Sequence, residues 1–194
     1  MNWLLDVRLF GCLGVVALTA PCLAQASSTG TYRPKLPAQS PPLRVEVIDG
    51  TRFRDIETKA IFRLHGIESC APGQMATLGR QPWPCGTMAT AWLVTATLNR
   101  WLACAVIREA GDERLARCAT ANHPDLAASM LREGVAVLAP AAADDQANPP
   151  SYGQAEQQAR KAYRGLWSST FEMPWDWRAH RSSAAPAATG EATP

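Results

Sequence analysis

The residues best suited to chemistry lie between Val47 and Pro72. This segment contains several arginines, several carboxylates and one histidine, His65. Carboxylates can hold a hard cation or take a proton from water, and guanidinium groups can bind a phosphate while charge develops on it. The segment is therefore the first candidate for a hydrolytic or anion-binding site.

The rest of the sequence predicts no other kind of catalytic site. The three histidines, His65, His123 and His180, show no paired spacing, and no two cysteines have the Cys-x-x-Cys spacing, so a zinc site is not expected. The sequence also contains no glycine-rich phosphate loop and no nucleophile elbow. A formal net charge of only +2 permits nucleic acid as a partner without indicating one.

Strands must position these side chains, because β-branched and aromatic residues alternate with polar ones along the segment. Farther along, Met88, Ala91, Trp92, Thr95 and Leu98 recur at helical spacing, and we expect this row to face the core. Five strands, with one helix after the third and two after the fifth, are typical of an OB-fold. We therefore predict an α+β, mainly β domain: a five-stranded OB-fold barrel with three helices. The expected strands are 43–48, 52–56, 60–64, 101–107 and 114–120, and the expected helices are 87–98, 124–133 (ending at Gly134) and 153–166, with 73–85 as a loop.

Four cysteines follow the N-terminal segment, at positions 70, 85, 104 and 118. In a hairpin centred on Gly111, Cys104 and Cys118 oppose each other, which brings them close enough for a disulfide bond. This pairing leaves Cys70 for Cys85. Each bond would close a loop of about 15 residues and contribute on the order of 3 kcal/mol. The alternative, four buried thiols, is more typical of a cytosolic protein.

The ends of the chain predict export and a single folded domain. A basic residue near the start, an apolar run from Leu9 to Ala20 and the sequence Ala24-Gln25-Ala26 are typical of a cleaved signal peptide. An uncleaved anchor is the alternative. The expected segments are a signal peptide at 1–26, a Pro/Ser-rich linker at 27–42, the domain at 43–178 and a disordered tail at 179–194. We expect a periplasmic or secreted monomer with no membrane anchor after signal cleavage.

Short motifs follow one another in a fixed order along the expected domain. They are Val47-Ile48-Asp49-Gly50, Phe62-Arg63-Leu64, Gly66-Ile67-Glu68, Pro82-Trp83-Pro84-Cys85-Gly86, Ala116-Arg117-Cys118, Leu131-Arg132-Glu133-Gly134, Arg164-Gly165-Leu166-Trp167 and Pro174-Trp175-Asp176-Trp177-Arg178. In this order they resemble the exported proteobacterial branch of the thermonuclease, or staphylococcal-nuclease-like, family. The resemblance extends over about residues 43–178. It implies an acidic, Ca²⁺-binding phosphodiesterase site on the rim of an OB barrel.

The resemblance further implies two carboxylate ligands for Ca²⁺, a glutamate base and two phosphate-binding arginines. The first ligand position holds Thr51, followed by Arg52; the second holds Glu68, and the base position holds Ala71, which cannot take a proton. Hard Ca²⁺ relies on several negatively charged oxygens. We therefore expect a degenerate active site without a Ca²⁺ cofactor and with little or no calcium-dependent nuclease activity. A rescued site, with His65 or Glu68 as the base, is the alternative.

The resemblance assigns phosphate contact to two arginines. Arg63 matches the first position, and Arg114 is the nearest match to the second, in a hairpin shorter than that of the family. With Arg52 they would surround Glu68 as a shallow anion-attracting rim, suited to weak binding of phosphate or nucleic acid. The alternative is that these arginines only form surface ion pairs with Glu68 and with carboxylates of the hairpin, such as Glu113.

Two further functions stay open from the sequence. One is a divergent phosphodiesterase that hydrolyses DNA or RNA with a different base. The other is a cell-envelope interaction protein that exposes Trp83, Trp175 and Trp177 to a partner, although tryptophan side chains more often pack in a core. The preferred hypothesis is an exported thermonuclease-like domain whose nuclease site has decayed.

Overall fold

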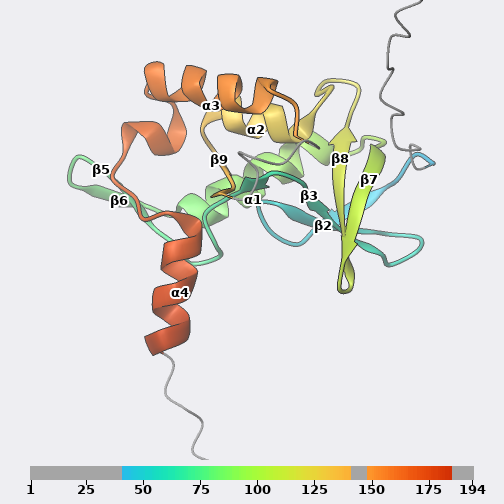
Figure 1. The fold of residues 1–194 in the computed structure, drawn as a ribbon, viewed down its shortest axis with the longest axis horizontal. Helices are drawn as coiled ribbons and strands as arrows, with labels where there is room; N and C mark the ends of the chain where they lie inside the picture. The colour runs from blue at the N-terminus through green and yellow to red at the C-terminus, as the bar shows by residue number, and fades with distance from the viewer. Residues whose placement is uncertain (1–40, 141–147, 185–194) are drawn as a thin grey trace, which may run out of the picture. The chain divides into compact units, whose positions relative to one another are not determined.

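Three short antiparallel strands begin the described part of the computed structural model, which covers residues 41–140 and 148–184. β1 (Val45–Val47), β2 (Arg52–Asp55) and β3 (Ile61–Leu64) are successive neighbours in the sheet (Figure 1). Phe53 and Phe62 pair across β2 and β3, and both rings are buried. Because successive side chains point to opposite faces of a strand, the arginines of β2 and β3 lie on the other face. The predicted signal peptide and most of the predicted linker lie outside the described residues.

A long hairpin completes the main sheet. β7 (Ala103–Ala110) and β8 (Glu113–Ala119) turn at Gly111, as predicted, and β8 lies parallel to β3. The strand order is β1-β2-β3-β8-β7, and among the described residues this sheet does not close into the predicted barrel. One isolated bridge, between Leu43 and Leu102, joins its two edges. Continuing that ladder along β7 would need residues 41 and 42, and both are prolines, which cannot donate a ladder hydrogen bond.

The prediction of a loop from Gly73 to Cys85 is wrong in part, because the segment contains a hairpin of β5 (Ala76–Leu78) and β6 (Gln81–Trp83). Pro82 lies opposite Thr77 in this hairpin. The N–H and C=O groups of Thr77 bond instead to Thr170, at 2.8 and 2.9 Å. Thr77 therefore has partners for both of its backbone groups, although Pro82 opposite it has no N–H to donate. A second small sheet pairs β4 (Ile67–Glu68) with β9 (Val137–Leu138).

The described chain contains four α-helices where three were predicted. Helix α2 ends at Gly134 as predicted, because Gly134 adopts the left-handed conformation with φ of 68°. The missed helix, α4, begins at Pro174, a residue that suits the first turn of a helix, and continues beyond residue 178, where the domain was expected to end. The helices are α1 (Cys85–Thr97), α2 (Leu126–Glu133), α3 (Ser151–Lys161) and α4 (Pro174–Ala184), and a 3-10 turn, η2 (Gly165–Ser168), follows α3.

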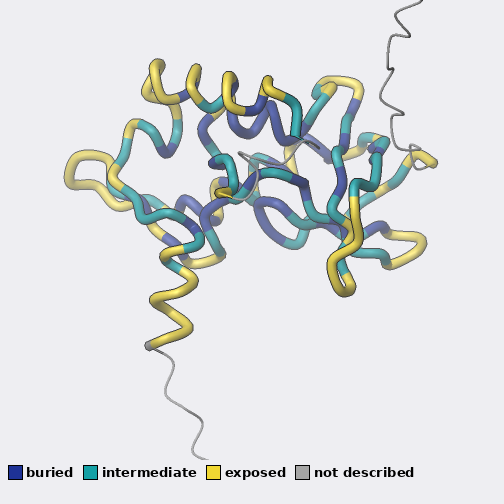
Figure 2. Tube along the Cα trace, in the orientation of Figure 1, coloured by how far each residue is buried: buried dark blue, intermediate teal, exposed yellow. Residues whose placement is uncertain are grey.

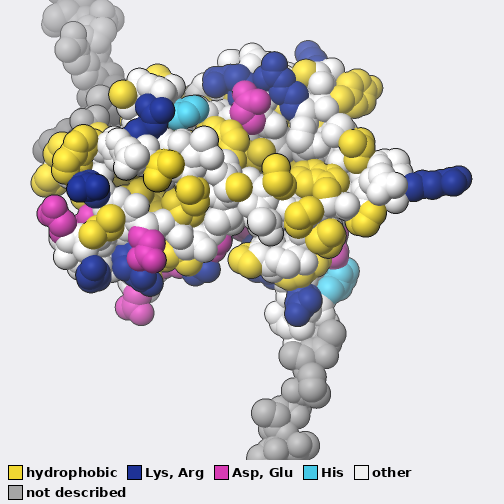
Figure 3. All heavy atoms as spheres, turned by 180° about the vertical axis from the view of Figure 1, so that it is seen from behind, with side chains coloured by type: hydrophobic (Ala, Val, Ile, Leu, Met, Phe, Trp, Pro, Cys, Tyr) yellow, Lys and Arg dark blue, Asp and Glu magenta, His cyan; other side chains and the backbone are white. Residues whose placement is uncertain are grey.

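Helix α1 buries a different face from the one predicted. Its buried side chains include Ala89, Leu93 and Ala96, whereas Met88 and Leu98 of the predicted row are 51% and 62% exposed. Hydrophobic side chains accordingly spread over the middle of the face in Figure 3. The helix carries no charged residue, so its sequence contains no charged face that would mark the side toward solvent.

Two hydrophobic clusters form the interior of the described part of the chain, and each contains one disulfide. Cys104 and Cys118 face each other in the larger cluster, between the sheet and helices α1 to α3. Cys70 and Cys85 join in the smaller cluster, which Trp83, Trp167, Phe171 and Trp175 cover. Both predicted pairings are confirmed. Figure 2 shows these buried regions, and it shows α4 exposed along most of its length. None of the described helices is long and apolar enough to cross a bilayer.

Candidate functional site

A cleft of about 220 Å³ opens beside the β1–β2 turn, at the start of the loop that follows β4. Helix α4 contributes Arg178 to one side of it. Most of the lining comes from the segment between Val47 and Pro72 in which the sequence predicted chemistry. The lining residues are Asp49, Thr51, Arg52, Arg63, Ser69, Cys70, Ala71, Pro72 and Arg178.

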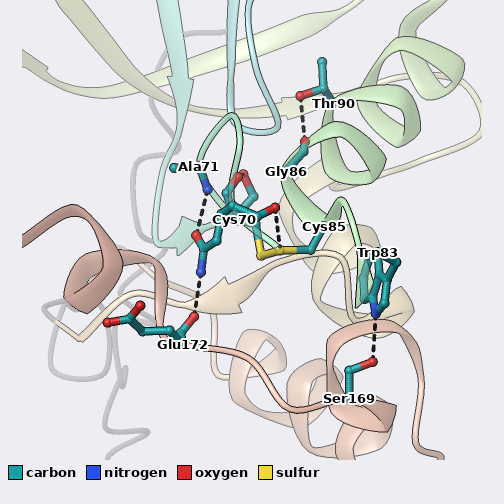
Figure 4. The surroundings of a disulfide bond; sticks show 10 residues. Cys70, Ala71, Trp83, Cys85, Gly86, Thr90, Ser169 and Glu172 are labelled. Carbon is teal, nitrogen blue, oxygen red and sulfur yellow. Dashed lines mark hydrogen bonds between the residues drawn. A yellow bond between two sulfur atoms is a disulfide. The ribbon is translucent and has the colours of Figure 1, made fainter. Parts of the chain in front are cut away.

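The loop on one side of the cleft is fixed by covalent and hydrogen bonds (Figure 4). The Cys70–Cys85 disulfide ties it to the first residue of α1. Gln74 is fully buried, accepts a hydrogen bond from the Ala71 N–H at 3.0 Å and donates one to the Glu172 carbonyl at 2.7 Å. Gln74 therefore links the cleft loop to the segment that leads into α4. The same side chain therefore contacts both the loop that carries Ala71 and the segment that precedes the helix of Arg178.

Asp49 is buried and fully engaged by its own turn. Its Oδ1 accepts hydrogen bonds from the N–H groups of Thr51 and Arg52, each at 2.9 Å. Its Oδ2 accepts a further bond from Arg52 Nε at 2.7 Å. This bond to Asp49 raises the pKa of Arg52 above its usual value. The motif Asp49-Gly50-Thr51-Arg52 thus forms a closed turn that holds a guanidinium group at the cleft.

Carboxylates and guanidinium groups alternate across the outer face of the sheet beside the cleft. Arg52 Nη1 donates to Glu113 Oε1 at 3.1 Å, and Arg63 Nη1 lies 3.8 Å from Glu113 Oε2. Arg63 Nη2 lies 3.9 Å from Glu68 Oε1, and the other Glu68 oxygen pairs with Arg178. With Asp49, the series contains three carboxylates and three arginines. The formal charges of this network cancel.

The residues at the predicted calcium site do not fit that ion. Thr51 supplies a hydroxyl where the resemblance implies a carboxylate, and Glu68 is already paired with Arg178 and flanked by Arg63. No group of three His, Cys, Asp or Glu side chains within residues 41–140 and 148–184 could hold a metal ion. A hard divalent cation requires several oxygens with net negative charge. Guanidinium groups therefore neutralise the carboxylates that a calcium ion would need.

Arg114 does not lie with the other predicted arginines. It pairs in register with Phe62, its guanidinium carbon lies 5.8 Å from the centre of that ring, and its ion-pair partner is Glu109. Glu113, one residue earlier, faces Arg52 and Arg63 instead. The structure thus brings together Thr51, Arg63, Glu68 and Ala71 but leaves Arg114 outside the cleft. The predicted rim of Arg52, Arg63 and Arg114 is replaced by Arg52, Arg63 and Arg178.

Sequence reasoning gave no role to Arg178, and it considered Glu113 only as an ion-pair partner of the arginines, which is the contact that Glu113 makes with Arg52 and Arg63. A signal for Glu113 exists, because Cys118 faces the core and residues 114 and 116 share its side of the strand. Residue 113 must then lie on the opposite face, with the arginines. Arg178 is 110 positions from Glu68, and only the packing of α4 brings the two together.

His65 lies apart from the cleft. It is buried, and its Nδ1 lies 3.0 Å from Asn148 Oδ1. It is not among the residues that line the cleft, which gives the alternative of His65 as a substitute base no geometric support. Of the tryptophans considered for a partner surface, Trp83 and Trp175 pack against the smaller core, and Trp83 Nε1 donates to Ser169 Oγ at 3.0 Å.

Comparison with known protein families places this site within a described family. The family model described as staphylococcal nuclease homologue matches residues 62–169, which is more than half of the chain. The matched span starts in β3, so it includes Arg63, Glu68 and Ala71 but not the Asp49 turn. No curated protein matches the chain.

Proposed function

Because the chain belongs to the family of staphylococcal nuclease homologues, we propose that it is an exported member without calcium-dependent nuclease activity, whose cleft binds phosphate weakly. The observation that carries this proposal is the neutral network of three carboxylates and three arginines at the cleft. In that network an internal guanidinium group stands beside each carboxylate that could otherwise serve a metal ion.

The chemistry of phosphodiester hydrolysis supports the loss of activity. The reaction needs a cation to neutralise the phosphate and a base to activate water. At the base position, the side chain of Ala71 is a methyl group, which cannot accept a proton. Loss of a general base typically lowers the rate of such a reaction by a factor of about 10² to 10⁴. The missing charge stabilisation by a metal adds a cost of several kcal/mol to the same barrier.

The cleft keeps groups that can contact a phosphate. The guanidinium of Arg63 makes no hydrogen bond of its own within the described residues, since both of its ion pairs are near 4 Å, and its side chain is 34% exposed. The hydroxyl-bearing residues Thr51 and Ser69 line the same cleft. A bound phosphate must compete with Glu68 and Glu113 for Arg63, and we therefore expect weak binding.

A nuclease assay on the purified chain tests the proposal. We expect no digestion of plasmid or single-stranded DNA with either Ca²⁺ or a chelator present. The Thr51→Asp/Ala71→Glu variant should also stay inactive, because Arg52 remains at the site. The Thr51→Asp/Arg52→Thr/Ala71→Glu variant then tests whether removal of Arg52 permits calcium binding, measured by calorimetry. Digestion by the unmodified chain that requires Ca²⁺, and that Arg63→Ser abolishes, would refute the proposal.

Export is proposed on the N-terminal sequence and the two disulfides. Cross-links of this kind persist in oxidising compartments such as the periplasm or the extracellular medium. The predicted cleavage follows Ala26. N-terminal sequencing of the protein recovered from a periplasmic extract or culture medium should therefore start at Ser27. Chains that retain Met1 in those fractions would contradict cleavage, and recovery of the protein only from the cytoplasm would contradict export.

A further inference from the structure

A second polar surface lies at the C-terminal ends of α2 and α3, which pack side by side (Figure 1). Arg132, Lys161 and Arg164 line an open hollow there of about 420 Å³. Tyr163 lies in the chain between two residues of the hollow and is 75% exposed. We propose that these four residues, named here the α2–α3 surface, bind single-stranded nucleic acid. This inference does not depend on the proposed role of the cleft.

Two glycines bring the basic residues together. Gly134 ends α2 and Gly165 follows α3, both with positive φ, and the Gly134 carbonyl accepts a hydrogen bond from the Leu166 N–H at 2.9 Å. A Cβ atom on Gly134 would lie 2.2 Å from the Arg164 carbonyl oxygen, and one on Gly165 would lie 2.5 Å from the Gly134 carbonyl oxygen. Only glycine permits this approach of the two backbones. The positions of Arg132 and Arg164 are therefore fixed by the fold.

The charge of this surface is not compensated as it is at the cleft. Arg132 and Lys161 have no ion-pair partner in the described parts of the chain, and Arg164 lies 3.9 Å from its only carboxylate there, Glu133. Arg164 Nη1 also donates to the Arg132 carbonyl at 3.4 Å, which holds the two residues as neighbours. Exposed cations without partners attract polyanions, mainly through their phosphate groups.

Tyr163 adds a feature that a simple salt-binding surface lacks. Its φ is 51°, in the left-handed region that non-glycine residues seldom occupy. The Tyr163 N–H bonds to the Arg160 carbonyl at 3.2 Å, and Arg160 itself stacks on Trp167, 3.9 Å from the ring centre. A well-fixed turn therefore leaves an aromatic residue exposed between Ala162 and Arg164, two residues that line the basic hollow. Stacking of bases on exposed aromatic rings beside basic residues is the usual mode of sequence-independent binding to single strands.

This combination favours single-stranded nucleic acid over an acidic protein. An acidic protein segment would use the cations but would gain little from Tyr163. A duplex would present phosphates, but its stacked bases could not reach an aromatic ring. An unpaired strand offers both groups at once.

Fluorescence anisotropy with a labelled oligothymidylate tests the proposal on the full chain with both disulfides formed. The Arg132→Ser/Lys161→Ser variant removes the two cations without partners, and Arg80→Ser/Arg108→Ser is the control, because it removes two exposed cations elsewhere. We expect the first variant to lower the slope of log K against log salt by about 1.4, since each single-strand phosphate contact contributes about 0.7. The control should leave the slope unchanged.

Tyr163→Asn separates stacking from charge. Asparagine tolerates the left-handed conformation better than most residues, so the turn is retained while the ring is lost. We expect binding about fivefold weaker or more, with an unchanged salt slope. Equal losses in both charge variants, equal competition by polyglutamate, or no binding by the unmodified chain would overturn the proposal. Binding that only Arg63→Ser abolishes would overturn it too, while placing the strand in the cleft.

Discussion

Gln74 gives the sharpest test of how the cleft is built. Its side chain is fully buried and satisfies two backbone groups, the Ala71 N–H at 3.0 Å and the Glu172 C=O at 2.7 Å. The Gln74→Leu variant keeps a similar volume but removes both bonds. Each partly buried group left without a partner costs about 1 to 2 kcal/mol, so we expect unfolding free energy to fall by about 2 to 4 kcal/mol. Urea denaturation, followed by tryptophan fluorescence, measures this change.

Gln74→Glu distinguishes the two bonds. A carboxylate can still accept from the Ala71 N–H but cannot donate to the Glu172 carbonyl when ionised. We expect this variant to be destabilised at neutral pH and partly recovered in mild acid, where the carboxyl group gains a proton and can donate again. The matched control is Gln81→Leu, at an exposed position of β6. A Gln74→Leu midpoint equal to that of the unmodified chain would show that the loop is held without this side chain.

Three further predictions follow from other contacts. Tyr152→Phe should lower the free energy of unfolding by about 1.5 to 3 kcal/mol in urea denaturation, because the buried Tyr152 hydroxyl lies 3.0 Å from both oxygens of Asp125. Burial and that carboxylate raise the pKa of Tyr152, so the hydroxyl stays protonated and donates the hydrogen bond. An unchanged denaturation midpoint would contradict this bond. Burial raises the pKa of Asp55, but hydrogen bonds from Thr58 and Glu57 and the charge of Lys59 together outweigh it, so the pKa is lowered overall. The stability that Asp55 contributes should therefore be present above about pH 4 and lost as the pH falls below that. Asp55→Asn should flatten this part of the pH profile of stability, and an unaltered profile would exclude Asp55 as its source. Cys104→Ser/Cys118→Ser should lower unfolding free energy by about 2 to 4 kcal/mol, and a midpoint insensitive to that change and to reductant would contradict the cross-link.

Local patterns were enough to predict much of the fold. Alternation identified β2 and β3 because one face of each strand is fully buried at Phe53 and Phe62. Symmetric spacing about Gly111 identified the Cys104–Cys118 pair, since a hairpin fixes its own register. These features depend on residues close in sequence. They can be read without knowledge of tertiary packing.

The features that were missed depend on packing or on ambiguous polarity. The buried face of α1 could not be identified, because apolar residues surround the helix and the exposed Met88 and Leu98 are as hydrophobic as the buried Leu93. The barrel was expected from strand order alone, but the prolines before Leu43 limit its closure to one bridge. Arg114 was assigned to the phosphate site by its residue type. Alternate residues of β8 face opposite sides of the sheet, and this alternation places Glu113, not Arg114, beside Arg63.

The compensated network also explains why replacing the two altered positions should not be enough to restore a calcium site. An aspartate at position 51 would lie beside Arg52, whose Nε is already 2.7 Å from Asp49 and whose Nη1 is 3.1 Å from Glu113. The new carboxylate would enter this network as another partner of Arg52, and the cation would have to displace a guanidinium group held by two acids. Opposite charges at these distances attract each other, even though solvent screens the Arg52 side chain, which is 39% exposed. Arg52 must therefore be removed together with the restored acids before calcium can compete, and a calcium-binding isotherm that appears in the double variant Thr51→Asp/Ala71→Glu would show that Arg52 does not occupy the position of the metal.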